Sequence, residues 1–105
     1  MSHVDLREKD LAVLRRTFRQ FPAVTEVRVF GSRANGTARR GSDLDLAISA
    51  PSATPTDWSD LCEALDNAPL IYELDLVRCE HAANERLRDK IAREGIPVYL
   101  EAAEA

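Results

Sequence analysis

The sequence has no long apolar run and contains little cysteine, glycine or aromatic residue. Its 105 residues include 2 Cys, 4 Gly and 1 Trp. No stretch approaches the roughly 18 consecutive apolar residues that cross a bilayer, so we expect no membrane segment. Residues 1–11 carry charges throughout, unlike the apolar stretch of a secretory leader. Because Cys62 and Cys79 are isolated, we expect reduced thiols and a cytoplasmic protein.

An excess of positive charge is also missing. The formal net charge is −4, whereas proteins that hold nucleic acid by its phosphates are usually basic. We therefore expect no strong direct binding of nucleic acid.

The length supports a single domain over residues 1–105. Such a short chain has little room for both a catalytic centre and an enclosed pocket for a second substrate. We expect that substrate to arrive with a partner or to lie on an open face.

The order of the predicted elements indicates the fold class. Apolar residues recur at helical spacing in some segments, and others are Val-, Ile- and Leu-rich runs bounded by Gly or Pro, typical of strands. We expect helices over residues 4–20, 56–67 and 82–94. Thr56 or Asp57 would cap the second helix, and Gly95 would close the last one as a C′ residue. We expect strands over residues 24–30, 43–49, 70–78 and, at an edge of the sheet, 97–100, and a loop or short helix over residues 33–42. This order predicts an α/β (α+β) domain of two layers, in which helices cover a mixed β-sheet.

Two aspartates at the start of the second strand suggest a metal site. Asp43 and Asp45 are two residues apart, so their side chains leave the same face of a strand, while Leu44 and Leu46 point the other way. Adjacent carboxylates repel unless a positive charge lies between them, and Mg²⁺ prefers carboxylate oxygen. The alternative is a pair of exposed aspartates without a function, since Asp-x-Asp is common by chance.

A glycine-serine pair directly follows the first predicted strand. At Gly31 the backbone can approach a ligand closely, and free N–H groups together with the Ser32 hydroxyl can hold phosphate. Alone, the pair is also typical of an ordinary turn. Combined with the aspartates, it favours binding of a metal-bound nucleoside triphosphate.

A third acid would complete the site. Glu73 and Asp75 share one face of the strand predicted over residues 70–78, and Tyr72, Leu74 and Leu76 share the other. A charge inside such an apolar run is seldom there for packing. Asp75 is our choice for the third ligand and Glu73 is its rival. The alternative is a half-exposed strand with polar residues outward.

These motifs resemble those of a known family. The stretch from Phe30 to Gly36 and the one from Ser42 to Leu46 resemble the signature of the polymerase β-type nucleotidyltransferase superfamily. More narrowly, the chain is similar to the minimal nucleotidyltransferases that serve as antitoxins beside HEPN-domain toxins. The similarity covers about residues 24 to 100. One departure is Asn35, where many relatives have Arg, which leaves a contact to the phosphates or the partner in doubt.

The resemblance implies a nucleotidyltransferase fold and a Mg²⁺-dependent enzyme that moves AMP from ATP to a hydroxyl of a HEPN toxin, with a tyrosine as the expected acceptor. It implies two Mg²⁺ ions on Asp43 and Asp45, with Asp75 on the ion nearest the nucleophile. Gly31 and Ser32 would hold the β- and γ-phosphates, with Arg33 as a helper. The toxin would be a partner in a hetero-oligomer.

Two other functions remain open at this stage. The chain could be an antitoxin that neutralises its partner by occlusion, with no need of catalysis. It could also modify a small molecule, as the similar aminoglycoside adenylyltransferases do, although those carry an additional helical domain for the acceptor. A template-directed polymerase is disfavoured, because the sequence has no strongly basic groove for a duplex.

Overall fold

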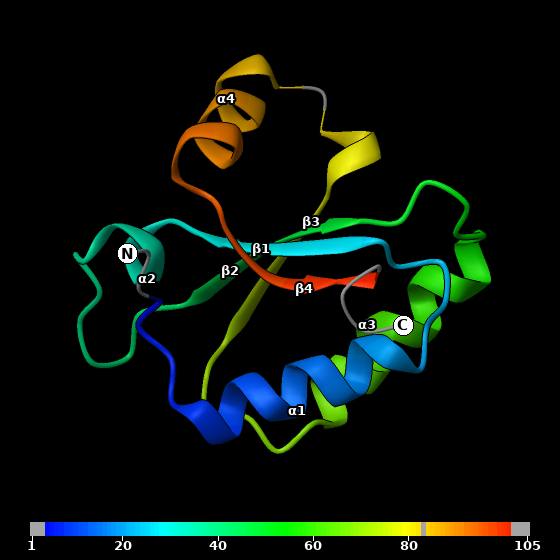
Figure 1. Cartoon of the computed structure of the whole chain (residues 1–105), viewed down its shortest axis with the longest axis horizontal. Coiled ribbons are helices and arrows are strands. Elements are labelled where there is room, and N and C mark those ends of the chain that lie inside the picture. The colour runs from blue at the N-terminus through cyan, green and yellow to red at the C-terminus, as the bar shows by residue number, and fades with distance from the viewer. Residues whose placement is uncertain (1–3, 83, 102–105) are drawn as a thin grey trace.

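A four-stranded mixed sheet carries helices on both of its faces (Figure 1). The computed structural model describes residues 4–82 and 84–101. The strand order is β3-β2-β1-β4, with β2 and β3 parallel and the other pairs antiparallel. None of the described helices is long and apolar enough to cross a membrane. The elements are α1 (Glu8–Arg19), β1 (Glu26–Phe30), α2 (Ser32–Asn35), β2 (Leu44–Ser49), α3 (Pro55–Asn67), β3 (Leu74–Arg78), the 3₁₀ turn η1 (Cys79–His81), α4 (Glu85–Glu94) and β4 (Ile96–Leu100).

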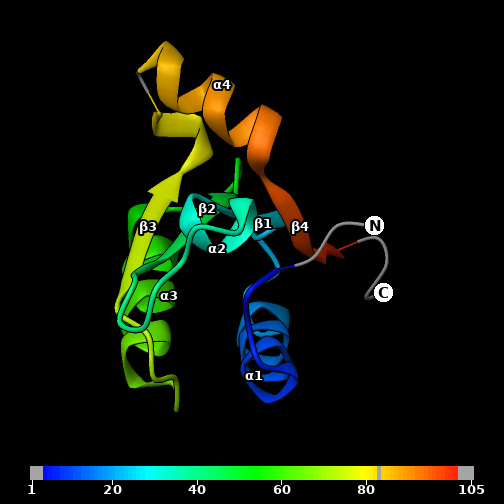
Figure 2. The same ribbon diagram turned by 90° about the vertical axis from the view of Figure 1, so that its left-hand side faces the viewer.

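The first face of the sheet packs on α1 and α3, which lie side by side beneath it (Figures 1 and 2). Alternate residues of each strand point to this face, so one set of apolar side chains forms the main core. From the helices, Leu14 and Phe18 of α1 meet Leu61 and Leu65 of α3. From the strands come Val27, Val29, Leu44, Leu46 and Ile48, all of them fully buried.

The second face of the sheet carries α4 and the turn η1 (Figure 1). Ile91 of α4 packs against Phe30 and Ala47 in a smaller cluster. By the same alternation, Asp45 in β2 and Asp75 in β3 also belong to this face. The sheet thus separates its large apolar core from the face that bears the carboxylates.

The predicted fold class is confirmed, and so is the edge position of the last strand. Five of the predicted starts are too early: β1, β2 and α4 begin one to three residues later than predicted, and two elements begin four residues later. The first helix begins at Glu8 rather than residue 4, because the backbone N–H of Asp5 donates to the carbonyl of Arg33, 2.8 Å away. The strand predicted from residue 70 begins at Leu74, opposite Leu44, where its neighbour β2 begins.

Two helix ends also differ from their predictions. α3 is capped by Thr54, two residues earlier than expected, and Asp57 completes a reciprocal capping box with it. Gly95 ends α4 with φ −65°, so it is not the left-handed cap we expected. A Cβ there would overlap the carbonyl oxygen of Ile91 and touch Arg28, so close packing is what requires this glycine.

The cap of α3 can be tested by a single substitution. Thr54→Ala removes the hydroxyl that accepts from the N–H of Asp57 at 3.1 Å. It should lower the free energy of unfolding by about 1 kcal/mol, measured by urea denaturation. Thr56→Ala is the matched control, because Thr56 lies in the first turn of the same helix and is exposed. It should change the free energy of unfolding much less. Equal losses in the two variants would contradict the assigned cap.

Candidate active site

Strand pairing brings three of the predicted site residues together on the second face of the sheet. Asp45 in β2 lies opposite Phe30, the last residue of β1. In the parallel ladder Asp45 is also the partner of Asp75 in β3. Gly31 follows Phe30 directly, so the turn and two carboxylates from separate parts of the sequence meet at one end of the sheet.

The backbone of Gly31 lies against the Asp45 carboxylate. Its φ is +73°, a value that residues with a side chain rarely adopt, and a Cβ there would overlap Oδ2 of Asp45. Gly31 is also the N-cap of α2, and the first N–H groups of a helix have no partner within it. Half-buried Ser32 adds a hydroxyl. The turn can therefore offer N–H and O–H donors to an anion beside the carboxylates.

The charges around Asp45 oppose its ionisation. Burial raises the pKa of Asp45 above its usual value, and the charge and hydrogen bonding of Asp75 raise it further. The charge of Asp43 raises this pKa as well, and that of Lys90 on α4 lowers it. Such a carboxylate is stabilised by a proton or a cation between it and its neighbour.

Lys90 is a residue of this region that the sequence does not single out. It is half-buried next to Ile91, which packs on the second face of the sheet, and its charge acts on Asp45. A lysine in this position can offset part of the negative charge of a bound phosphate group. Sequence periodicity places Lys90 on a helix but does not indicate which face of the sheet that helix covers.

The carboxylates fit a magnesium ion that is bound together with a nucleotide. Within residues 4–82 and 84–101, no group of three or more carboxylate, imidazole and thiol side chains could hold an ion by itself. Mg²⁺ usually binds one or two protein carboxylates plus substrate phosphates and water. The cross-strand pair of Asp45 and Asp75 supplies two carboxylates of this kind. The raised pKa of Asp45 is a further reason for a cation to bind there.

The other two predicted acids lie outside the strands. Asp43 is exposed and directly precedes β2. Glu73 is exposed and precedes β3, and its carbonyl accepts from the N–H of Leu44 at 2.8 Å. Glu73 lines a pocket of about 330 Å³ together with Arg40 and Tyr72. Of the two rivals on this segment, Asp75 is therefore the one paired with Asp45.

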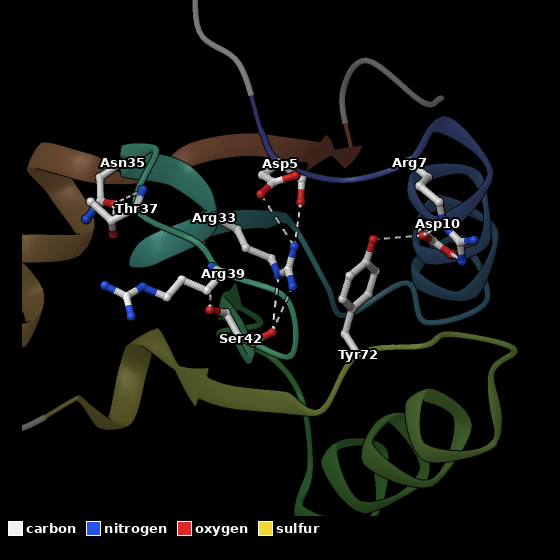
Figure 3. A network of polar contacts seen from close by, with 9 residues as sticks. All are labelled: Asp5, Arg7, Asp10, Arg33, Asn35, Thr37, Arg39, Ser42 and Tyr72. Atoms are coloured by element: carbon white, nitrogen blue, oxygen red, sulfur yellow. Dashed lines mark hydrogen bonds and ion pairs between the residues drawn. The ribbon is translucent and has the colours of Figure 1, made fainter.

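Arg33 has protein partners in this structure (Figure 3). It is buried, its guanidinium donates to the carbonyl oxygens of Ser42 and Asp5, and it lies over the ring of Tyr72. The contact with phosphate that the resemblance implies stays a prediction, and these partners do not favour it.

Asn35 connects α2 with α4. Its Nδ2 donates to Oε1 of Glu94 at 3.1 Å, and its Oδ1 accepts from the N–H of Thr37. The departure from the usual Arg therefore has a structural consequence, since this hydrogen bond connects the short helix after the Gly31 turn with the helix that carries Lys90.

A separate pocket of about 460 Å³ lies at the opposite end of the sheet. Its lining includes Phe21, Val24, Ala50, Trp58 and Leu61. None of the predicted site residues borders it, so it is not part of the candidate site.

Comparison with known families decides what kind of site this is. Residues 12–104 match the family described as polymerase beta, nucleotidyltransferase. The chain belongs to the polymerase β nucleotidyltransferase family. The matched range contains the Gly31 turn, Asp45 and Asp75, and the predicted enzyme class, a nucleotidyltransferase, is confirmed.

The similar proteins include minimal members of this family. The chain is 34% identical over 79 residues, 72% of its length and 68% of the relative's, to MntA of Haemophilus influenzae, a candidate protein adenylyltransferase. It is 38% identical to a candidate minimal nucleotidyltransferase of solved structure, with a TM-score of 0.64, covering 85% of this chain and 88% of that one. These two matches confirm the predicted resemblance to the minimal nucleotidyltransferases.

A more distant match shows the fold alone. It is a chain from the complex of a tri-AMPylated HEPN toxin of Shewanella oneidensis with an MNT antitoxin. The TM-score is 0.60 at 19% identity, over 94% of this chain and 76% of that one.

The close approach of Gly31 to Asp45 predicts a specific effect of adding one methyl group. Gly31→Ala should lower the nucleotidyltransferase rate on the order of 100-fold, because the new Cβ displaces the Asp45 carboxylate. Gly36→Ala is the matched control, since Gly36 also has a positive φ, +83°, but no atom within 4 Å of an added Cβ. Gly31→Ala should also lose more stability than Gly36→Ala, because of the overlap with Asp45 and because its ψ of −151° lies outside the left-handed helical region that Gly36 occupies. Rates are therefore measured well below the Tm of both variants. Equal losses of activity would contradict a role for the close approach.

The raised pKa of Asp45 predicts that its charge destabilises the metal-free protein. When the pKa of an acid is higher in the folded protein than in the unfolded chain, where it is near 3.8, the ionised group lowers the free energy of unfolding. This loss grows as the pH rises from the unfolded pKa through the folded pKa. Asp45→Asn should therefore raise Tm at pH 7 in EDTA, and its advantage should shrink as pH falls toward 4. Thermal denaturation at several pH values checks this. Asp60→Asn, exposed on α3, is the control, and a lower Tm for Asp45→Asn at pH 7 would contradict the prediction.

Proposed function

We propose that this nucleotidyltransferase moves AMP from ATP to a hydroxyl of a partner protein, a tyrosine of a HEPN-domain toxin, and so acts as its antitoxin. The observation that carries the proposal is the Asp45–Asp75 pair beside the Gly31 turn. This arrangement puts two carboxylates next to N–H and O–H donors, as binding of a metal-bound triphosphate requires. We expect the reaction to take place in the cytoplasm.

The relatives support the acceptor and the partner. MntA is described as a protein adenylyltransferase, and the structural neighbour from Shewanella oneidensis comes from a complex with an AMPylated HEPN toxin. The openness of the site also favours a macromolecular acceptor. Asp43 and Asp75 are both exposed, so a side chain presented by another protein could reach them from solvent.

In the proposed reaction the acceptor oxygen forms a bond to the α-phosphorus of ATP. The bond from that phosphorus to the bridging oxygen breaks, and pyrophosphate leaves with the electron pair. The hydroxyl proton passes to the exposed carboxylate of Asp75. The N–H groups and hydroxyl at Gly31 and Ser32 hold the β- and γ-phosphates, which fixes the leaving group in line with the attacking oxygen.

Asp45, Asp75 and Asp43 would hold Mg²⁺ with the nucleotide, in a site for two ions. Bound Mg²⁺ would neutralise charge on the phosphates and lower the pKa of the attacking hydroxyl. The half-buried position of Asp45 strengthens its attraction for a cation, because fewer waters screen the charge.

Transfer of label tests the proposal. The protein is incubated with Mg²⁺, ATP labelled at the α-phosphate, and a HEPN-domain protein, chosen from the neighbourhood of its gene if one is encoded there. We expect label on the partner with the wild type and with the control Asp60→Asn, and none with Asp45→Asn or Asp75→Asn. Replacement of the partner's acceptor tyrosine by Phe should also remove the label.

Three results would overturn the proposal. The first is inhibition of the partner by Asp45→Asn at full strength and without label, which would favour occlusion by a binding module. The second is label found on an added aminoglycoside and not on the partner. The third is transfer that continues unchanged in EDTA, which would exclude the metal.

A further inference from the structure

Strand pairing fixes the positions of two of the three predicted metal ligands, Asp45 and Asp75, but not that of Asp43. Asp45 and Asp75 lie within paired strands, whereas Asp43 is exposed and lies between β2 and a turn. That turn is closed by the N–H of Ser42, which donates to the carbonyl of Arg39 at 2.9 Å, and Gly41 in it has a φ of +86°. Something other than strand pairing must set the direction of the Asp43 side chain.

Arg33 holds the peptide that precedes Asp43 (Figure 3). Its Nη2 and Nε both donate to the carbonyl oxygen of Ser42, at 2.9 and 3.3 Å. On the other side of Asp43, the N–H of Leu44 donates to the carbonyl of Glu73 at 2.8 Å. Asp43 therefore lies between two anchored peptide groups, and Arg33 provides the anchor that does not belong to the sheet.

The position of Arg33 is itself closely determined. The side chain is only 9% exposed. Its Nη1 donates to the carbonyl of Asp5 at 3.2 Å and lies 3.6 Å from the Asp5 carboxylate. The guanidinium carbon is 4.5 Å from the centre of the Tyr72 ring. The planar guanidinium of an arginine can lie over an aromatic ring and donate several hydrogen bonds at the same time. The ammonium group of a lysine cannot make this combination of contacts.

Tyr72 is held in turn by the buried carboxylate of Asp10 in α1, whose ion-pair partner Arg7 is exposed. Its hydroxyl donates to Oδ2 of Asp10 at 3.0 Å. Asp10 is 1% exposed and accepts from Nε and Nη2 of Arg7, at 2.7 and 3.0 Å. Removing one partner of a buried charge is strongly unfavourable, so this group resists displacement. The contacts run without a break from α1 to the turn before Asp43.

We infer that Arg33 is a positioning residue, which orients Asp43 through the carbonyl of Ser42, and that the Tyr72–Asp10–Arg7 group holds Arg33 in place. The inference rests on the proposed function in one respect, namely that Asp43 helps to bind Mg²⁺ with ATP. This positioning role differs from that of a phosphate ligand. As a positioning residue, Arg33 affects the binding of Mg²⁺ through Asp43 and does not contact the nucleotide.

Two sets of measurements on the full chain separate these roles. Backbone ¹⁵N relaxation reports the order of the Asp43 amide without any metal. Titrations then give the ATP affinity in EDTA and the Mg²⁺ concentration that half-saturates binding in the presence of ATP. The variants are Arg33→Lys, Tyr72→Leu and Tyr72→Phe. Arg39→Lys is the control, because it changes an exposed arginine of the same loop.

For Arg33→Lys and Tyr72→Leu we expect a more mobile Asp43 amide and a half-saturating Mg²⁺ concentration raised on the order of tenfold. The ATP affinity in EDTA should stay unchanged. Tyr72→Phe keeps the ring under Arg33 and loses only the hydroxyl, so its effects should be smaller than those of Tyr72→Leu. Arg39→Lys should match the wild type. If Arg33→Lys does not fold, the two Tyr72 variants still provide the test.

Two results would overturn the inference. One is weaker ATP binding in EDTA by Arg33→Lys with an unchanged Mg²⁺ requirement, as expected of a phosphate ligand. The other is an Asp43 amide as ordered in Tyr72→Leu as in the wild type. Failure of the proposed function is distinguishable, because the wild type itself would then transfer no label to the partner, while Mg²⁺ binding with ATP and the order of the Asp43 amide would still test the inference.

Discussion

The pairing of Asp45 with Asp75 across two parallel strands is the constraint on which the rest of the site depends. It holds the exposed Asp75 beside the half-buried Asp45, and burial together with this like charge raises the pKa of Asp45. This repulsion does not disturb the large core on the other face of the sheet. Side chains alternate between the two faces of a strand, so the carboxylates do not contact the core. A cation between the carboxylates would relieve this repulsion.

Loops and helices around this pair supply what the strands cannot. The Gly31 turn approaches the Asp45 carboxylate so closely that no side chain fits between them. On the other side, α4 brings Lys90 toward the acids, and Asn35 ties α4 to the turn through Glu94. The acids, the Gly31 turn and a positive charge thus come from four elements, and a short chain can build the site without an enclosed pocket.

Local patterns were sufficient to predict much of this arrangement. Alternation in β1 and β2 places Asp45 on the face opposite Leu44 and Leu46, and the Gly-Ser pair marks the turn. Two errors have the same origin. The first helix and the strand before Asp75 begin later than their periodicity suggests, because residues 4–7 and 70–73 are used in contacts with other segments. Periodicity reports which residues are apolar, and it contains no information on such contacts.

The sequence by itself determined the fold class and the motifs that mark the family, because alternation, helical spacing and short motifs are local properties of the chain. Only the tertiary structure decided between Asp75 and Glu73, since that choice depends on the register between β2 and β3. It also decided that Arg33 lies buried against Ser42, Asp5 and Tyr72. These partners are remote in sequence, and a buried arginine and an exposed one look the same until the chain has folded around them.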